Sequence, residues 1–321
     1  MLDIAPDQLD KILSGPTLIH LPGRKASPLF VSALVHGNEV TGLMAIQSYL
    51  KKCAGKTLPR ALSVFIGNVK AAKHGKRMLA DQPDFNRIWG VGDTPESLMA
   101  REALEQMKRR DVFACIDIHN NTGLNPHYAS VTKKNDRFFQ LATIFSRMVV
   151  YYIKPEGTLA GAFSRLCPSV TVECGLPGTD YGVTHASEFI KGVMRLDHIS
   201  SQQVHDHDLE LYRTVAIVKT PSGVSYGFGG EENVINYRDD LDRLNFRELP
   251  PGTSFGKVKA GFDSLPEAWD ENWTEVTHKY FALVKGEIAL TQPVMPSMLT
   301  KKIDIIRQDC LCYFMERVNG G

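Results

Sequence analysis

Residues Phe30–Glu39 read FVSALVHGNE, an apolar run that stops abruptly at a histidine, a glycine, an asparagine and a glutamate. A helix-like pattern follows at once over residues 40–53. A short apolar run in front of a helix predicts a buried strand, with His36 and Glu39 at its C-terminal end. Both side chains are of types that bind zinc, so the stretch predicts two ligands of a metal site.

The composition is that of an ordinary globular protein. The 321 residues suffice for one large domain, or for a large and a small one. With 43 % apolar residues, 23 % charged residues and a formal net charge of +1, the chain has no global field that favours nucleic acid or an anionic membrane. We therefore expect no nucleic-acid partner and no membrane partner.

The first residues and the cysteines indicate a cytoplasmic protein. Residues Met1–Asp7 carry acids and lack the apolar core of a signal peptide, and no run approaches the roughly 20 apolar residues of a membrane span. The six cysteines are scattered, several of them inside apolar runs, which is typical of reduced, buried thiols. Cys310 and Cys312 would share one face of a strand, and we expect them in the core rather than on a metal.

Strand-like and helix-like segments alternate down to about residue 198. Strands are expected at residues 17–20, 29–35, 61–67, 112–118, 127–132, 149–153 and 169–172. Helices are expected at residues 39–53, 94–110, 136–148, 157–166 and 183–198. This alternation predicts an α/β fold, with a mostly parallel or mixed sheet flanked by helices.

The pattern changes after the polar stretch Ser200–Asp208. Strand-like runs separated by proline and glycine follow at residues 211–220, 246–256, 280–290 and 302–315. We therefore expect an α/β domain of residues 1–200 and a smaller β-rich C-terminal domain of residues 201–321.

Residues with catalytic side chains stand at or after the ends of several predicted strands, where the chemistry of open α/β sheets gathers. Besides His36 and Glu39, these are Arg77, Asn86 and Arg87 after strand 61–67, His119 after strand 112–118 and Glu173 after strand 169–172. Two histidines and a glutamate suit a catalytic zinc site, which keeps one position open for water. Nearby arginines argue for a small anionic substrate.

The His-x-x-Glu spacing alone is weak evidence, because the chain repeats it at His185/Glu188 and His207/Glu210. We expect the first pair on a helix surface and the second in a solvated linker that also contains His205. The alternative for His36 is a hydrogen-bonded histidine at a strand–helix turn. Ligand-type residues at matching strand ends favour the metal site over that alternative.

Several other polar residues keep two interpretations. Asn86-Arg87 could hold a carboxylate or form a structural cap with a salt bridge. Asp117 could support the metal site or simply belong to its strand, which we favour, and Asn120 could orient a substrate or cap a turn. The basic run Lys70–Arg77 is expected to be a solvated face apart from Arg77.

Five motifs in order resemble the succinylglutamate desuccinylase/aspartoacylase family, which belongs to the wider zinc carboxypeptidase fold. They are His36-Gly37-Asn38-Glu39, the Asn68-to-Arg77 spacing, Asp84-Phe85-Asn86-Arg87, Asp117-Ile118-His119-Asn120 and Glu173-Cys174-Gly175. The resemblance covers residues 29 to about 180. It implies a zinc-carboxypeptidase-like sheet, and the family also carries a C-terminal β domain.

The resemblance implies a role for each matched residue. His36, Glu39 and His119 match the ligands of one zinc ion per chain. Glu173 matches the general base, and Arg77 matches the arginine that polarises the scissile carbonyl.

The resemblance also points to residues that would bind substrate. Asn86 and Arg87 match the pair that holds the substrate's carboxylate. Arg165 is the candidate for an arginine that grips an acidic side chain, although its spacing differs from the family's. The stretch Val284–Thr291 lacks the tyrosine of the aspartoacylase branch, which argues against N-acetylaspartate as the substrate.

Together these features predict a zinc-dependent amidohydrolase that cleaves a small anionic N-acyl amino acid. One alternative is a metallocarboxypeptidase acting on short peptides, which would need a longer and more open cleft. A non-catalytic zinc-binding protein is the other alternative, and Glu173 argues against it because such a protein would not need a general base.

Overall fold

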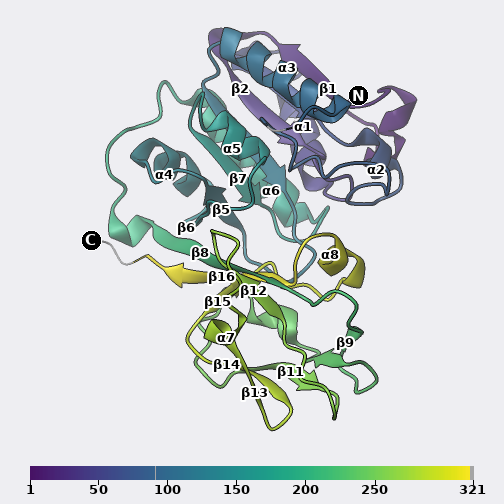
Figure 1. Cartoon of the computed structure of the whole chain (residues 1–321). Helices are drawn as coiled ribbons and strands as arrows, with labels where there is room; N and C mark the ends of the chain where they lie inside the picture. Colours follow the sequence, from purple (N-terminus) through teal and green to yellow (C-terminus); the bar gives the residue numbers. More distant parts are fainter. Residues whose placement is uncertain (91, 319–321) are drawn as a thin grey trace. The chain divides into compact units, whose positions relative to one another are not determined.

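The structure, a computed structural model, describes residues 1–90 and 92–318 (Figure 1). The chain forms two compact units. The first consists of Met1–Asn120 and His127–Leu211, and the second of Asn121–Pro126 and the described residues from Tyr212 onward.

The first unit contains a mixed sheet with strand order β1-β3-β2-β4-β7-β5-β6. Its strands are β1 (Thr17–Leu21), β2 (Gly23–Ala33), β3 (Leu58–Ile66), β4 (Ala114–His119), β5 (Tyr128–Val131), β6 (Met148–Tyr151) and β7 (Ser169–Glu173). Strands β3, β2, β4 and β7 are parallel, whereas β1 runs antiparallel to β3 and β5 runs antiparallel to β7. The predicted α/β fold with a mixed sheet is confirmed.

Helices cover both faces of this sheet. They are α1 (Thr41–Lys52), α2 (Val69–Lys73), α3 (Pro95–Arg109), α4 (Asp136–Thr143), α5 (Leu159–Phe163) and α6 (Asp180–Arg195), and a 3-10 helix, η1, spans Pro6–Lys11. Side chains alternate along β2, so Leu29 and Val31 join the apolar cluster under α1, α4 and α6. Phe30 joins the cluster under α3 and α5 on the opposite face.

The second unit is rich in β structure, as predicted. Strand β8 (Glu210–Lys219) pairs with β16 (Cys312–Arg317) and β12 (Glu267–Trp269), and β16 pairs with β15 (Met295–Ser297). A five-stranded sheet has the order β13 (Phe281–Val284), β14 (Glu287–Leu290), β11 (Ser254–Val258), β10 (Ile235–Tyr237) and β9 (Tyr226–Phe228). Short helices complete the described chain: η2 (Asp206–Asp208), η3 (Leu241–Leu244), α7 (Thr277–Tyr280) and α8 (Ile303–Gln308).

Several predicted segments differ from the structure. Of the run 246–256, only the residues from Ser254 onward belong to a strand, β11. The run 302–315 begins as helix α8, with Asp304 in its first turn and Arg307 in its last, a charge order that suits a helix dipole. The run 280–290 is a hairpin of β13 and β14, because Lys285 and Gly286 take positive φ and reverse the chain. The predicted helix 136–148 ends at Thr143.

Two expectations concern the chain as a whole. No helix in residues 1–90 and 92–318 is long and apolar enough to cross a membrane. The six cysteines form no disulfide in the described structure, and Cys310 and Cys312 are buried, as expected for core residues.

Candidate metal centre

The turn after β2 brings the first two predicted ligands into place. The strand ends at Ala33, and Leu34 takes a left-handed conformation with φ of 55°. Gly37 lies so close to α2 that a Cβ there would stand 2.2 Å from the backbone nitrogen of Ala72, so only glycine fits. The Gly37 amide donates to the carbonyl of Arg77 at 3.0 Å, which ties the turn to the segment that carries the arginine.

His36, Glu39 and His119 form a buried cluster in which one ligand atom of each lies within 4.8 Å of the others. Nδ1 of His36 is 2.8 Å from one Glu39 carboxylate oxygen, and Nδ1 of His119 is 2.8 Å from the other. Within the described parts of the chain, this is the one group of three such residues arranged to hold a metal ion. Its composition fits a zinc site with three protein ligands.

A carboxylate fixes the far side of each histidine ring. Nε2 of His36 lies 3.1 Å from Oδ1 of Asp84, and Nε2 of His119 lies 2.9 Å from Oδ2 of Asp117. Ser32 in turn donates to Asp117 at 2.5 Å. These contacts leave both Nδ1 atoms directed at Glu39, the arrangement that orients histidines toward a metal.

Asp117 is therefore more than a strand residue, which corrects the interpretation favoured from the sequence. It lies in β4 and is completely buried, and its carboxylate holds the ring of His119.

Asp84 connects the histidine to the arginine. Besides His36, it accepts a hydrogen bond from Nη2 of Arg77 at 2.9 Å. Burial acts to raise the pKa of Asp84, but His36 and the guanidinium groups of Arg77 and Arg87 outweigh it and hold the pKa below its usual range. Arg77 itself is buried, with Nη1 3.7 Å from Glu39. The predicted arginine thus lies beside the cluster.

Glu173 is the last residue of β7 and pairs in register with His119, the last residue of β4. Adjacent strands are about 4.8 Å apart, and paired residues project from the same face, so the two side chains are neighbours. Burial raises the pKa of Glu173 to about 7, against the opposing effect of His119. A carboxyl group that titrates near neutral pH is suited to accept a proton and return it.

Asn86 and Arg87 lie in a turn that follows Asp84. The Asn86 amide donates to Oδ1 of Asp84 at 2.7 Å, and Oδ1 of Asn86 accepts from the Leu159 amide at 2.9 Å. Arg87 donates to the Asn86 carbonyl at 2.9 Å. These contacts fix the conformation of the turn. The guanidinium of Arg87 is close enough to Asp84 to lower the pKa of that carboxyl group, so the positive charge of Arg87 lies near the cluster.

Asn120 makes its contacts within the protein. Its Oδ1 accepts from the Thr41 amide at 3.2 Å, and its Nδ2 donates to the Gly175 carbonyl at 2.9 Å. Its backbone amide donates to the Glu39 carboxylate at 3.2 Å. This pattern favours the capping interpretation over direct contact with a substrate.

Arg165 is the predicted site residue that is not brought to the cluster. It follows α5 and its side chain is exposed, and no contact in the described structure joins it to the cluster. Its role in binding a substrate therefore stays a prediction.

Tyr152, which the sequence analysis missed, lies among the site residues. Its hydroxyl donates to Oγ1 of Thr158 at 3.2 Å. Burial raises the pKa of Tyr152, and Asp117 and Arg87 lie close enough to act on it. It follows β6, which runs antiparallel to β7, so the strand-end rule that selected His119 does not select it and no spacing in the sequence marks it.

The other two His-x-x-Glu pairs form no comparable site. His185 is hydrogen-bonded to His127 at 2.8 Å, and Glu188 pairs with Lys52 on the surface. His207 is exposed and lies 3.3 Å from Asp208.

The comparison that decides the family is with the succinylglutamate desuccinylase/aspartoacylase catalytic domain, whose signature matches residues 25–199. The chain belongs to this family. Its matched span contains every residue of the cluster described above. No curated protein matches the chain.

Solved structures share the fold of this family member at low sequence identity. The succinylglutamate desuccinylase of Chromobacterium violaceum has 17 % identity and a TM-score of 0.60, over 94 % of this chain and 89 % of its own. Murine aminoacylase 3 has 15 % identity and a TM-score of 0.58, over 92 % and 96 %. The product-bound ectoine utilization protein of Ruegeria pomeroyi has 14 % identity and a TM-score of 0.58, over 94 % and 88 %.

Replacing Asp84 by Asn should weaken metal binding about 10- to 100-fold, because the neutral amide no longer holds His36 and Arg77 through a carboxylate. Competition for zinc against a chromophoric chelator measures the effect. Asp81→Asn, at an exposed carboxylate nearby, is the matched control and should leave the affinity unchanged. An Asp84→Asn variant with unaltered affinity would contradict the role of this carboxylate.

Proposed function

We propose that the chain is a zinc-dependent amidohydrolase that removes the acyl group from a small N-acyl amino acid. The observation that carries the proposal is the buried trio His36, Glu39 and His119, with Glu173 in register beside it. Family membership supports it, because the family is named for two activities that cleave amides of acylated amino acids.

The residues of the site supply the parts that amide hydrolysis needs. Zinc held by the trio would make water a nucleophile near neutral pH and polarise the carbonyl. Glu173 accepts the proton of the attacking water and returns it to the nitrogen of the leaving amine as the C–N bond breaks. The Arg77 guanidinium stabilises the negative charge that develops on the carbonyl oxygen.

Arg87 supports an anionic substrate. Its planar guanidinium can bind a carboxylate through two parallel hydrogen bonds, and the turn of residues 84–87 positions it. The acyl-amino-acid activities named for the desuccinylases and the aminoacylase among the structural neighbours are consistent with such a substrate.

The direct test is amine release from a panel of N-acyl amino acids and short peptides, with zinc-loaded and chelated protein side by side. The proposal expects zinc-dependent hydrolysis of at least one N-acyl amino acid. Activity on peptides alone would move the chain to the metallocarboxypeptidase alternative. Zinc bound in stoichiometric amount without activity on any substrate would contradict the deacylase proposal.

Arg87→Ala should raise KM roughly 10- to 100-fold with a smaller change in kcat, because it removes a charge-assisted contact to a carboxylate already present in the bound substrate. Steady-state kinetics on the substrate identified in the panel measure KM and kcat separately. Arg101→Ala, at an exposed arginine of α3, is the control. A fall in kcat at constant KM would assign Arg87 to the transition state instead.

A further inference from the structure

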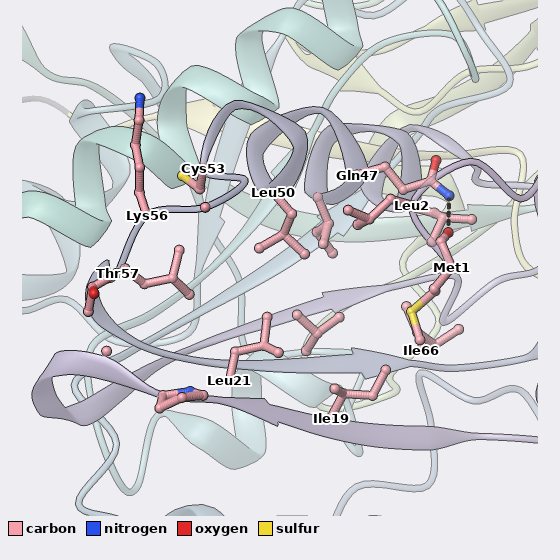
Figure 2. A pocket seen from close by; sticks show the side chains of 17 residues that line it. Met1, Leu2, Ile19, Leu21, Gln47, Leu50, Cys53, Lys56, Thr57 and Ile66 are labelled. Atoms are coloured by element: carbon pink, nitrogen blue, oxygen red, sulfur yellow. Dashed lines mark hydrogen bonds between the residues drawn. The ribbon is translucent and has the colours of Figure 1, made fainter.

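A cavity with a volume of about 780 Å³ lies in the first unit between α1 and the strands β1 and β3 (Figure 2). None of the metal-binding residues lines it. Its volume is within the range of about 300–1,000 Å³ that is usual for ligand pockets. Because the cavity shares no residue with the proposed catalytic site, a ligand bound in it would be independent of the proposed function.

Two apolar layers face each other across this cavity. Leu43, Ile46 and Leu50 follow one another at helical spacing on α1, and Ile19 of β1 lies opposite Val64 of β3 in the antiparallel pair. Helix α1 packs over β2 and β4, the strands beyond β3 in the sheet, which leaves the β1 side of the face open. Figure 2 shows the helix side chains and the strand side chains directed toward the same space.

The polar side chain at the Met1 end of the lining, Gln47, is already engaged. Nε2 of Gln47 donates to the carbonyl oxygens of Met1 at 3.0 Å and Ile4 at 2.9 Å. Thr57 and Lys56 lie at the opposite end of the cavity from Met1 (Figure 2). Water inside the cavity would find few partners along its length, and such a space favours an apolar guest.

The lining also indicates what kind of apolar guest fits. It contains no aromatic ring and no acidic side chain, so nothing in it is built to stack on a planar ring or to bind a cation. The stretch from Leu43 on α1 to Cys53, the residue that caps its C-terminal end, extends over about 15 Å, the length of a slot rather than of a round cavity. An unbranched hydrocarbon chain matches this shape and this chemistry.

A lysine stands at one end of the slot, and Figure 2 shows its ammonium group turned away from the apolar side chains. Lys56 is exposed and makes no ion pair within residues 1–90 and 92–318, whereas the nearby Lys51 and Lys52 pair with Asp3 and Glu188. We propose that this cavity binds a single unbranched aliphatic chain with an anionic head group, as in a fatty acid. The chain lies between α1 and β1, and the head group emerges at the Lys56 end of the slot, where the flexible four-carbon side chain of Lys56 turns to meet it.

Calorimetric titration of the zinc-loaded full chain with dodecanoate, kept below its micelle concentration, tests the proposal. The expected result is saturable binding of one molecule per chain. Leu50→Trp should fill the slot and weaken binding at least about tenfold, equivalent to about 1.4 kcal/mol. Leu98→Trp, at an exposed leucine of α3, is the matched control. Absence of saturable binding, or equal binding by the Leu50 variant, would overturn the proposal.

The head group is tested separately. Lys56→Glu should weaken dodecanoate binding roughly fivefold and leave dodecanol binding unchanged, while Lys108→Glu on α3 should change neither. An equal loss for the acid and the alcohol would remove the anionic head group from the proposal. A photoreactive fatty acid on the unaltered protein should label the peptide of residues 43–58, and labelling confined to other regions would place the chain elsewhere.

Discussion

Replacing Glu173 by Gln is expected to lower kcat roughly 10²- to 10⁴-fold while zinc stays bound at one equivalent per chain. The amide keeps the size of the side chain at the end of β7 but cannot accept the proton of the attacking water. Turnover of the substrate identified above and metal content by elemental analysis measure the two quantities on the same sample. Loss of zinc together with activity would show that Glu173 is a ligand and not the base.

The free energy of unfolding of the Glu173→Gln variant shows whether the substitution damages the fold. Burial raises the pKa of Glu173 in the folded chain to about 7 from its ordinary value of 4.5. The folded state therefore binds the proton more tightly, and stability falls as pH rises from 4.5 to 7. Above pH 7 the buried carboxylate costs about 3 kcal/mol, which Gln removes.

Metal-free Glu173→Gln should accordingly be more stable than the unaltered protein at pH 8, and the difference should vanish at pH 4.5. Denaturant unfolding of both proteins at the two pH values measures it. A variant that is less stable at pH 8 would mean that the loss of turnover reports damage to the fold. A pH-independent difference would contradict the raised pKa of the carboxyl group.

The succession of strands and helices along the chain could be predicted from the sequence where the hydrophobic patterns were long and distinct. Strand β2 and the start of α3 both have local causes. The strand has a buried apolar run, and the Thr94 side chain caps the helix by accepting a hydrogen bond from the Ser97 amide. Helix α8 was missed because a short apolar segment has the same composition in a helix and in a strand.

The convergence of His36, Glu39 and His119 was predictable because parallel strands bring their carboxyl ends to one edge of a sheet. His119 and Glu173 are paired in register even though they are far apart in the sequence. The roles of Asp84 and Tyr152 could not be read in the same way, since both depend on where loops fold back onto the cluster. Asp84 carried a signal in the Asp-Phe-Asn-Arg motif, but no spacing indicated that its partner would be His36.

Replacing His119 by Ala should reduce bound zinc from about one equivalent to a trace and abolish turnover, because only two protein ligands would remain. The variant also leaves Asp117 buried with Ser32 as its remaining polar partner among the contacts described, which should lower the free energy of unfolding by roughly 1–3 kcal/mol. His278→Ala, at an exposed histidine of the second unit, is the control for both measurements. Stoichiometric zinc in the His119 variant would remove this residue from the ligand set. Zinc loss in that variant, set beside zinc retention in Glu173→Gln, would distinguish ligand from base at two strand ends that lie side by side.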